Sequence, residues 1–537
     1  MFLILTGIAG LCLLYFSAFH PERFGFYRDD SMYVVMAKAI ATGQGYRIIS
    51  LPDAPVQTKS PPFFPFVLSL LWKVNPEFPG NLTQMMLLSV GASILFFGLT
   101  YRYLVFSGYA NRWQAVLVVG LTAINWRIIV LATGIYSEML YAALSVLALY
   151  LAEKYEKRTG HWGFGAATGV VIGLAFLTRS AGITLVFAIA LYFLYRRERR
   201  GILPVIIAGM VVLCWLGWGY LNGRTAENTN AGSYESYFQT FRTLIATGGQ
   251  SNLTALLGVI GRNALGLILI SIPVVCLGLA YDSVLYFGFA FLFIAGGFLR
   301  QARAKLGLMH FYIVTYLSVH LLWPYTAYDR FLMPLLPFLL LFMLIEVQAI
   351  LAVIRNVFAV QKQIISRASA SFIGLALVFS AGAVLYNYGL GMYRAVTLAS
   401  LRKDSRPSTD DAEAIEWIES HTDPADVLIC YRDPLYYLYT NRKSARSSLV
   451  TGGAFLQSSP VGTDDAAKII LRIIEENKAK YLVLTRSDFG LEYRPDLEQQ
   501  NYEALLERNP ELFTPTFEST GEGSRIYRIN LDRTDRR

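Results

Sequence analysis

The chain has 537 residues, of which 54% are hydrophobic and only 16% are charged, with a mean hydropathy of +0.43. Ordinary soluble domains carry about 25% charged residues, so this composition excludes a chain that is soluble along its whole length. The net charge of +9 does not indicate a nucleic-acid partner, because much of the basic excess lies in short clusters between apolar stretches, as it does in the cytoplasmic loops of membrane proteins.

Neither the cysteines nor the histidines form a recognisable site. The four cysteines stand apart from one another, with no disulfide framework and no CxxC spacing. The five histidines are scattered, which argues against a histidine-rich metal site. We therefore expect no required cofactor or metal, and a divalent cation that bridges carboxylates and a phosphate is the alternative.

Residues 2–19 form the first apolar stretch and are expected to span the membrane, because they lack the basic start and the cleavage site of a signal peptide. About eleven transmembrane helices are predicted in all. The other ten lie near residues 84–106, 113–131, 135–152, 163–178, 181–195, 202–221, 283–299, 307–323, 331–351 and 371–390. Within them, Gly165, Gly169 and Gly173 follow the small-xxx-small spacing that lets membrane helices pack closely.

The basic clusters of the chain indicate whether the apolar stretch at 253–280 crosses the membrane. These clusters should all face the cytoplasm, and they lie near residues 154–158, 196–200, 300–305 and 355–367. Because an even number of crossings must separate them, we expect an interfacial or re-entrant element at 253–280. The first polar loop, the loop at 222–251 and the C-terminal region are then all on the outer face.

The first polar loop carries an acidic pair, Asp29 and Asp30, directly after the first span. The pair opens a segment at 31–42 whose apolar residues recur at helical spacing. One interpretation is structural, since an Asp caps a helix and a second acid complements the helix dipole. The other is catalytic, because capping needs one acid only and two acids beside a membrane suit a general base.

The same loop continues with Lys59-Ser60-Pro61-Pro62-Phe63. The proline pair favours an extended entry to a helix that starts at Phe63 and is too short to span, so we expect this helix to lie in the interface. Pro61, Pro62 and Phe63 are candidates to line a lipid groove. Lys59 either binds a phosphate or extends its amine to lipid headgroups without any role in a reaction.

Three further polar motifs stand at the expected outer ends of spans. Tyr136-Ser137-Glu138 enters the fourth span, Arg179 closes the hairpin between the fifth and sixth, and Asp329-Arg330 precede the tenth. The side chain of a single arginine at the interface usually reaches the lipid headgroups and has no further function. Together, however, these motifs supply carboxylates that accept protons and cations that bind phosphate.

Residues 395–537 alternate polar and apolar residues and predict a small α/β domain outside the membrane. Helices are expected at 410–420 and 464–477, and strands at 427–430, 481–484 and 525–529. No GxGxxG or P-loop motif indicates a soluble nucleotide. The predicted organisation is a transmembrane domain at 1–394, with its catalytic first outer loop at 20–82, followed by the extracytoplasmic domain at 395–537.

In their order along the chain, these motifs resemble the C-type glycosyltransferase superfamily. The shared motifs are the acidic pair, Lys59 to Pro62, Ser137-Glu138, Leu177-Thr178-Arg179 and Arg330 to Pro337. Within the superfamily, the chain is most similar to the branch of protein O-mannosyltransferases and the lipid A aminoarabinose transferase. Asp433 to Arg442 is similar to a segment of the extracytoplasmic domains of bacterial relatives. Thr58-Lys59 stands where the aminoarabinose enzymes have an acid-lysine pair, and Ser60 separates Lys59 from the prolines, which argues against lipid A as the acceptor.

The resemblance implies an enzyme of the cytoplasmic (inner) membrane that transfers a sugar, with inversion, from a polyprenyl-phosphate donor to a lipid, glycan or protein acceptor on the outer face. By position, Asp29 or Asp30 matches the catalytic base, and Glu138 the acid of the second outer loop. Lys59 and Arg330 match ligands of the donor phosphate. Arg179 is a further phosphate ligand, and Tyr136 joins the proposed substrate groove.

Two other functions were compatible with a polytopic chain. A ligase that uses a polyprenyl-diphosphate glycan would concentrate its chemistry in a late outer loop, whereas here the acids cluster in the first. A lipid or sugar transporter would show internal repeats and charges near mid-membrane. The chain has no clear repeat, and Arg127 is the nearest candidate for such a charge.

Overall fold

The computed structural model describes residues 2–25, 28–157, 161–223, 251–278, 287–323, 329–359, 364–401, 409–446, 463–485, 495–521 and 523–531. Most of the loop predicted at 222–251 lies outside these residues. The chain forms two compact units. The first consists of Met1–Phe19, Leu88–Cys214 and Leu253–Leu398, and the second of His20–Leu87, Trp215–Asn252 and Ala399–Arg537.

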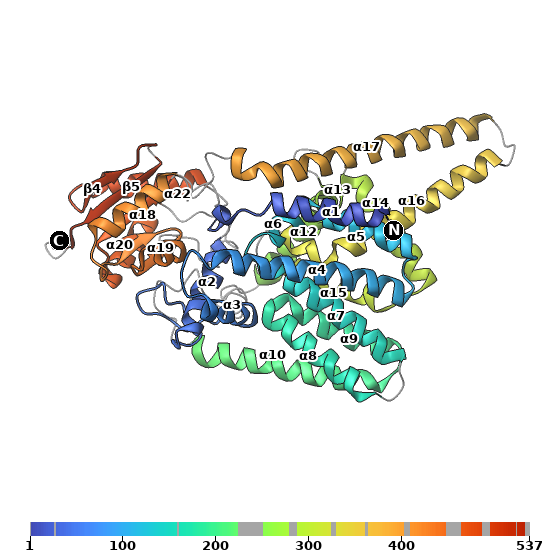
Figure 1. Cartoon of the computed structure of the whole chain (residues 1–537), viewed down its shortest axis with the longest axis horizontal. Helices are drawn as coiled ribbons and strands as arrows, with labels where there is room; N and C mark the ends of the chain where they lie inside the picture. The colour runs from blue at the N-terminus through green and yellow to red at the C-terminus, as the bar shows by residue number, and fades with distance from the viewer. Residues whose placement is uncertain are drawn as a thin grey trace. The chain divides into compact units, whose positions relative to one another are not determined.

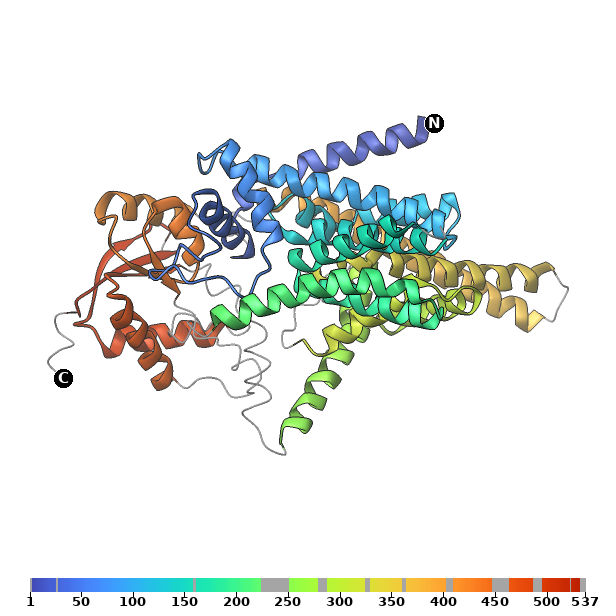
Figure 2. The same cartoon turned by 90° about the horizontal axis from the view of Figure 1, so that it is seen from below.

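The first unit is helical. Its helices are α1 (Phe2–Ser17), α4 (Leu82–Ser107), α5 (Arg112–Ala123), α6 (Trp126–Ala132), α7 (Ser137–Lys157), α8 (Trp162–Thr178), α9 (Ile183–Tyr195), α10 (Ile202–Gly223), α12 (Ser251–Leu265), α13 (Ile272–Leu277), α14 (Phe287–Ala304), α15 (Leu308–Leu321), α16 (Leu336–Ala359) and α17 (Ile364–Leu401). One end of each of α4, α10, α12 and α17 extends into the second unit. Helices α7, α8 and α9 pack side by side (Figures 1 and 2).

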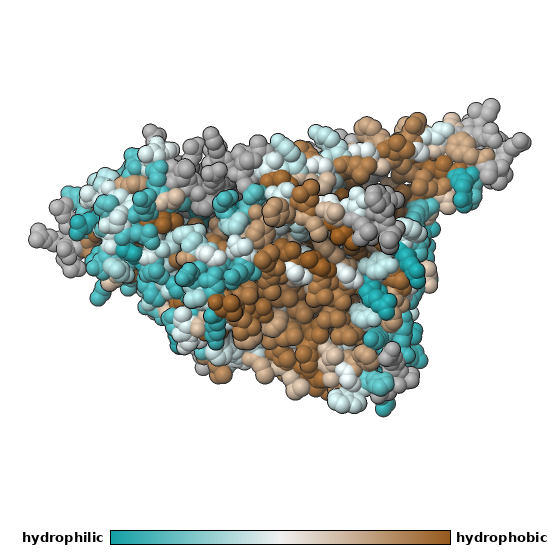
Figure 3. Space-filling view, viewed as in Figure 1, coloured by the Kyte–Doolittle hydropathy of each residue, from teal (hydrophilic) through white to brown (hydrophobic). Residues whose placement is uncertain are grey.

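The helices of the first unit have the properties of membrane spans. In the part of the chain that the structure describes, five helices are long and apolar enough to cross a membrane, or six when α5 and α6, bent by 68° at their junction, count as one crossing. Large hydrophobic side chains such as Leu95, Val170, Leu213 and Phe372 are exposed. Figure 3 shows the hydrophobic surface gathered over this helical part. The protein is therefore a multi-pass helical membrane protein.

The stretch predicted at 253–280 is helical from Ser251 to Leu277. A π-helical turn, Gly266–Ser271, joins α12 to α13 without a break. The resulting helix at Leu256–Leu277 is long and apolar enough to cross a membrane, whereas an interfacial or re-entrant element was expected. Length and composition alone do not decide whether this helix crosses, so the interfacial or re-entrant placement stays a prediction.

The three glycines at small-xxx-small spacing pack as predicted. They lie where α8 meets α10, and a Cβ added at Gly169 would be 2.9 Å from the backbone oxygen of Pro204. A Cβ at Gly173 would likewise meet Val211 at 2.9 Å. Because a side chain at either position would push the helices apart, these glycines serve helix packing.

The second unit combines the first polar loop with the C-terminal residues. The loop contains α2 (Arg28–Ala41) and the predicted short helix, α3 (Phe63–Val74). The C-terminal elements are α18 (Thr409–His421), β1 (Leu428–Cys430), α19 (Asp433–Thr440), β2 (Ser444–Arg446), α20 (Thr463–Asn477), β3 (Tyr481–Thr485), α22 (Pro495–Arg508), β4 (Phe513–Glu518) and β5 (Ser524–Ile529).

The five strands form one mixed sheet in the order β2-β1-β3-β5-β4. β1 pairs in parallel with β2 and β3, and β5 pairs antiparallel with β3 and β4. Strands β1, β3 and β5 lie where the sequence predicts strands. β2 and β4 were not predicted, since β2 has only three residues and Pro515 within β4 is compatible only with an edge strand, which β4 is.

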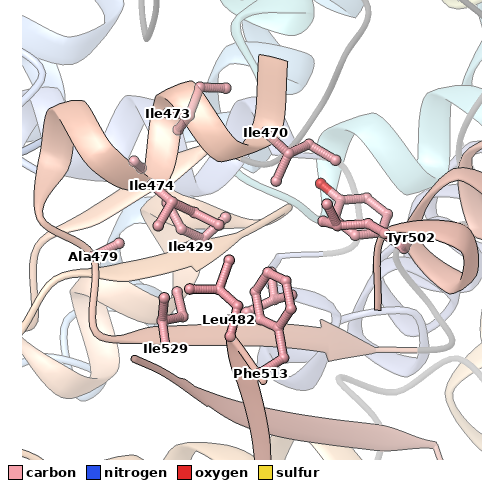
Figure 4. Close-up of a cluster of buried hydrophobic side chains, with 12 residues drawn as sticks. Ile429, Ile470, Ile473, Ile474, Ala479, Leu482, Tyr502, Phe513 and Ile529 are labelled. Atoms are coloured by element: carbon pink, nitrogen blue, oxygen red, sulfur yellow. The ribbon is translucent and has the colours of Figure 1, made fainter. Parts of the chain in front are cut away.

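Helices cover the sheet on both faces. On one face, Ile470, Ile473 and Ile474 of α20 and Tyr502 of α22 pack against Ile429 and Leu482 of the strands (Figure 4). On the other face, Ala414 and Ile418 of α18 and Tyr436 of α19 pack against Leu428 and Val483. The isoleucines recur at helical spacing along α20, so they lie on one face of the helix and pack together on the sheet.

The first loop packs on α19. A Cβ at Gly25 would lie 2.7 Å from Cδ1 of Leu435, and Gly25 has a φ of +87°, so close approach and backbone conformation both favour glycine there. The ring of Phe78 meets that of Tyr439 edge-on, with centroids 4.9 Å apart. The backbone N–H of Ser444 donates to the carbonyl oxygen of Ser50 at 2.9 Å. The C-terminal residues thus support the loop that carries the acidic pair.

Candidate active site

The acidic pair lies in the first turn of α2, where the helix dipole favours negative charge. Asp30 is only 1% exposed. Its Oδ2 accepts the backbone N–H of Gly25 at 2.9 Å, and its Oδ1 accepts that of Ser31 at 2.6 Å. Asp29 is exposed to solvent. The two adjacent acids are therefore unequal, since Asp30 orders the entry to the helix and Asp29 faces outward.

The backbone that presents Lys59 is fixed by hydrogen bonds. The side-chain oxygen of Gln57 accepts the N–H of Lys59 at 2.7 Å, and the indole of Trp218 donates to the Gln57 carbonyl at 3.2 Å. The hydroxyl of Tyr46 donates to the carbonyl of Ser60 at 2.8 Å. Burial raises the pKa of Tyr46 well above its ordinary value, so this hydroxyl remains a donor. Lys59 itself is half-buried.

The lipid-groove candidates follow Lys59 directly. Pro61 is buried, Pro62 precedes α3 and Phe63 begins it. The helix ends at Val74 after 12 residues, too short to cross a bilayer. Phe66 and Leu70 are exposed on one side of it. That side is suited to apolar contact with lipid.

In the first unit, Glu138 binds two arginines at once. Its Oε1 lies 2.8 Å from Nη1 of Arg179 and 2.6 Å from Nε of Arg330. Glu138 is 1% exposed, and the arginine side chains are 16% and 19% exposed. Arg179 also donates to Oγ of Ser137 at 3.0 Å. One carboxylate oxygen thus holds two guanidinium groups close together in a mostly buried place.

Three separate elements bring these charges together. Glu138 is the second residue of α7, Arg179 lies in the turn between α8 and α9, and Arg330 begins the 3-10 turn Arg330–Leu335 before α16. The turn at Arg179 is tight because a Cβ on Gly182 would lie 2.5 Å from the backbone of Phe176. Glycine at 182 thus permits the tight turn that carries Arg179.

Arg127 and Asp329 extend this cluster. Nε of Arg127 lies 3.0 Å from Oδ2 of Asp329, the residue before Arg330. The guanidinium also stacks over the ring of Trp126, 4.3 Å from its centroid. The sequence named both residues but did not pair them, and it considered Arg127 only as a transporter-like charge. A signal for the pairing is hard to find, since 202 positions separate the two residues.

Tyr136 packs beside the cluster. It is 4% exposed, and its ring lies 6.0 Å from the guanidinium carbon of Arg330. A Cβ on Gly134 would lie 2.3 Å from the ring, so glycine at 134 makes room for it. The tyrosine predicted in the substrate groove is therefore a neighbour of a predicted phosphate ligand.

The predicted site residues fall into two groups. Glu138, Arg179, Arg330 and Tyr136 come together in the first unit, and Asp29, Asp30, Lys59 and the residues of the lipid groove belong to the second. Convergence of the two groups on one substrate stays a prediction. Among the described residues, no group of three or more His, Cys, Asp or Glu side chains is arranged to hold a metal ion.

Residues 59–218 match the sequence profile of the dolichyl-phosphate-mannose-protein mannosyltransferase family. The chain is similar to this branch of the C-type glycosyltransferases. The family match confirms the resemblance seen in the sequence and supports an enzyme of the glycosyltransferase class. A search of curated proteins finds no match.

Solved structures show the same fold. ArnT from Cupriavidus metallidurans in the apo state superposes with a TM-score of 0.55 at 13% identity, over 98% of both chains. The same ArnT bound to undecaprenyl phosphate superposes with a TM-score of 0.54 at 13% identity, over 98% of this chain and 97% of the ArnT chain. The archaeal oligosaccharyltransferase AglB from Archaeoglobus fulgidus was solved in complex with an inhibitory peptide and a dolichol-phosphate. It superposes with a TM-score of 0.51 at 13% identity, over 98% of this chain and 74% of AglB.

Proposed function

We propose that the chain is an inverting membrane glycosyltransferase that moves a sugar from a polyprenyl-phosphate donor to an acceptor hydroxyl on the outer face of the cytoplasmic membrane. The observation that carries the proposal is the pair of arginines on Glu138, in a fold shared with an ArnT solved with undecaprenyl phosphate. A phosphate bound to lipid needs such fixed cations, because its leaving group gains charge as the sugar departs.

The arginines are suited to the donor phosphate. Each guanidinium carries five N–H donors in a rigid fork. A single carboxylate oxygen cannot accept all of these donors. Glu138 therefore acts as a positioning residue that orients Arg179 and Arg330, rather than as the proton acceptor predicted from its position in the sequence. Lys59 adds a third cation to the donor phosphate, and the apolar stretch from Pro61 to Phe63 with Tyr136 contacts the prenyl chain and sugar.

The reaction is a single displacement. The acceptor oxygen attacks the anomeric carbon, its proton passes to Asp29, and the bond from the anomeric carbon to the phosphate oxygen breaks. The electron pair of that bond leaves with the polyprenyl phosphate. Asp29 is preferred to Asp30 as the base, because both oxygens of the buried Asp30 already accept backbone N–H groups, whereas Asp29 is exposed to solvent.

The membrane topology follows the same proposal. About eleven crossings are proposed, made by the long helices other than Leu256–Leu277, the bent pair α5–α6, the shorter apolar helices other than α3, and α7 and α14. The C-terminal domain lies on the same side as the first loop, the extracytoplasmic side, because residues 20–87 and 399–537 belong to one compact unit. No cofactor is needed, since a lipid-linked sugar phosphate is already activated. A divalent cation that assists the phosphate is tested by adding a chelator.

A second candidate is a transferase of glycans linked to polyprenyl diphosphate. It is favoured by the third arginine, Arg127, whose partner Asp329 adjoins Arg330, because a diphosphate donor carries more negative charge than a monophosphate donor and suits more cations. The two candidates differ in the number of phosphates on the lipid.

Mass spectrometry of lipids that co-purify with the protein tests the donor directly. The proposal expects a prenyl monophosphate, with or without one sugar. A prenyl diphosphate carrying a glycan would favour the second candidate. Glycan profiling of a deletion strain then identifies the product, and an unchanged glycan profile together with no prenyl lipid would contradict both.

A further inference from the structure

Two lysines from distant parts of the second unit gather around one tyrosine. Lys38 lies on α2, Lys443 follows α19, and Tyr437 lies on α19. The ammonium nitrogens lie 4.7 Å and 5.5 Å from the centroid of the Tyr437 ring. Lys38 also lies 6.0 Å from the ring centroid of Trp72 on α3. The two ammonium groups repel each other, because the charge of Lys443 lowers the pKa of Lys38.

Neither lysine is neutralised by an acid in the part of the chain that the structure describes. Lys38 donates to Oδ1 of Asn441 at 2.8 Å, and Lys443 donates to the carbonyl oxygen of Ile49 at 2.5 Å. Both acceptors are uncharged. Each ammonium has three N–H donors, so these bonds orient the lysines and leave donors for a ligand.

Keeping this pair of charges costs stability. Partial burial lowers the pKa of Lys38, and the charge of Lys443 lowers it further. Burial also lowers the pKa of Lys443. The aromatic faces offset part of this cost, but an anion between the amines would offset more. A cost of this kind is expected where a site binds a ligand.

We propose that Lys38, Lys443 and Tyr437 form a subsite for a phosphate group carried by the acceptor. Two ammonium charges complement the charge of about −1.5 to −2 on a phosphate monoester, whereas a single carboxylate would leave one of them uncompensated. The inference rests on the proposed function, in which Lys59, Arg179 and Arg330 bind the phosphate of the donor. This subsite is then left for the second substrate.

The spacing along α2 limits the shape of that acceptor. Asp29 and Lys38 belong to the same helix, nine positions apart, so their Cα atoms are separated by about 14 Å along its axis. The acceptor therefore extends far enough to place its hydroxyl near Asp29 and its phosphate near Lys38. A small free sugar phosphate does not meet this requirement.

Isothermal calorimetry tests the subsite. The full-length protein in detergent is titrated with inorganic phosphate at low ionic strength. The double variant Lys38→Gln/Lys443→Gln removes both charges and keeps a polar side chain that is one atom shorter than lysine. It should bind phosphate at least about tenfold more weakly than the wild type, the loss of roughly one charge-assisted hydrogen bond. Lys73→Gln, at an exposed lysine on α3, is the matched control and should bind like the wild type. Equal binding by the wild type and the double variant overturns the subsite.

A second titration, with undecaprenyl phosphate in micelles, separates acceptor from donor. The double variant should bind this lipid as the wild type does, while Arg330→Ala should not. If the double variant loses the lipid as well, the lysines belong to the donor and the acceptor assignment is wrong. If no form binds the lipid, the proposed donor fails while the comparison with inorganic phosphate still stands.

Thermal unfolding separates binding from structure. Because the lysines repel each other, the double variant should unfold at the same temperature as the wild type or a higher one. A lower unfolding temperature with unchanged phosphate binding identifies the pair as structural and contradicts the subsite.

Discussion

Two buried carboxylates, one in each unit, are held in opposite ways. Glu138 in the first unit accepts from two guanidinium groups, whereas Asp30 in the second accepts from two backbone N–H groups. Both are 1% exposed. Burial alone therefore says little about the role of an acid, and its partners say more.

The partners point to different tasks. An acid bound to two cations fixes the position of those cations and leaves them a net charge for an anionic ligand. An acid bound to backbone amides fixes the local chain, and here the fixed chain presents the neighbouring Asp29 to solvent. This comparison is the reason we propose that Arg179 and Arg330 of the first unit bind the donor phosphate and that Asp29 of the second unit accepts the proton.

The largest expected effect is the loss of turnover when Asp29 is replaced. Asp29→Asn keeps the shape of the side chain and removes the base, so kcat should fall by about 10² to 10⁴, while binding of the donor is unchanged. A transfer assay with purified donor measures both. Asp53→Asn, at an exposed acid of the same loop, should retain wild-type turnover. Wild-type turnover by Asp29→Asn would move the base to Asp30 or Glu138.

Removal of Glu138 should reduce stability more than removal of any exposed acid. Glu138→Ala leaves two mostly buried arginines without their shared carboxylate, a change that costs about 3 to 5 kcal/mol. Glu346→Ala, which breaks a bidentate pair with the half-exposed Arg300, should cost about 1 kcal/mol or less. Thermal unfolding in detergent compares the two. Equal shifts would show that Glu138 does not hold the arginine cluster together.

Arg330 should affect the binding of the donor rather than proton transfer. Arg330→Ala removes a charge-assisted contact, so affinity for undecaprenyl phosphate should fall by about tenfold to a hundredfold. Arg300→Ala, at a paired arginine that is 54% exposed, provides the control and should bind normally. Unchanged donor affinity and rate in Arg330→Ala would make this residue an interfacial anchor only.

The smallest expected effect concerns the ring of Tyr437. Tyr437→Leu removes the aromatic face between the lysines, and a partly exposed cation–π contact of about 0.5 to 1 kcal/mol corresponds to a two- to fivefold loss of phosphate affinity. Tyr437→Phe retains the face and should bind phosphate like the wild type. If both variants lose affinity equally, the hydroxyl matters rather than the ring.

The sequence alone determined the class of protein and most of its elements. Long apolar stretches predict membrane helices because the cost of burying polar groups in lipid is a property of each segment by itself. The short helix after Pro62, the packing role of Gly169 and three of the five strands follow from similarly local patterns. The order of Asp29, Lys59, Glu138, Arg179 and Arg330 along the chain carried the family resemblance, again without any contact being known.

Only the tertiary structure decided which charges meet. Arg330 and Glu138 are separated by 192 positions, and Lys38 and Asn441 by 403. No periodicity in the sequence connects residues so far apart, because their pairing depends on how whole helices and turns pack. The unequal environments of Asp29 and Asp30, and the lysine pair around Tyr437, are consequences of that packing. The residue types were visible from the start, and their partners were set by the fold.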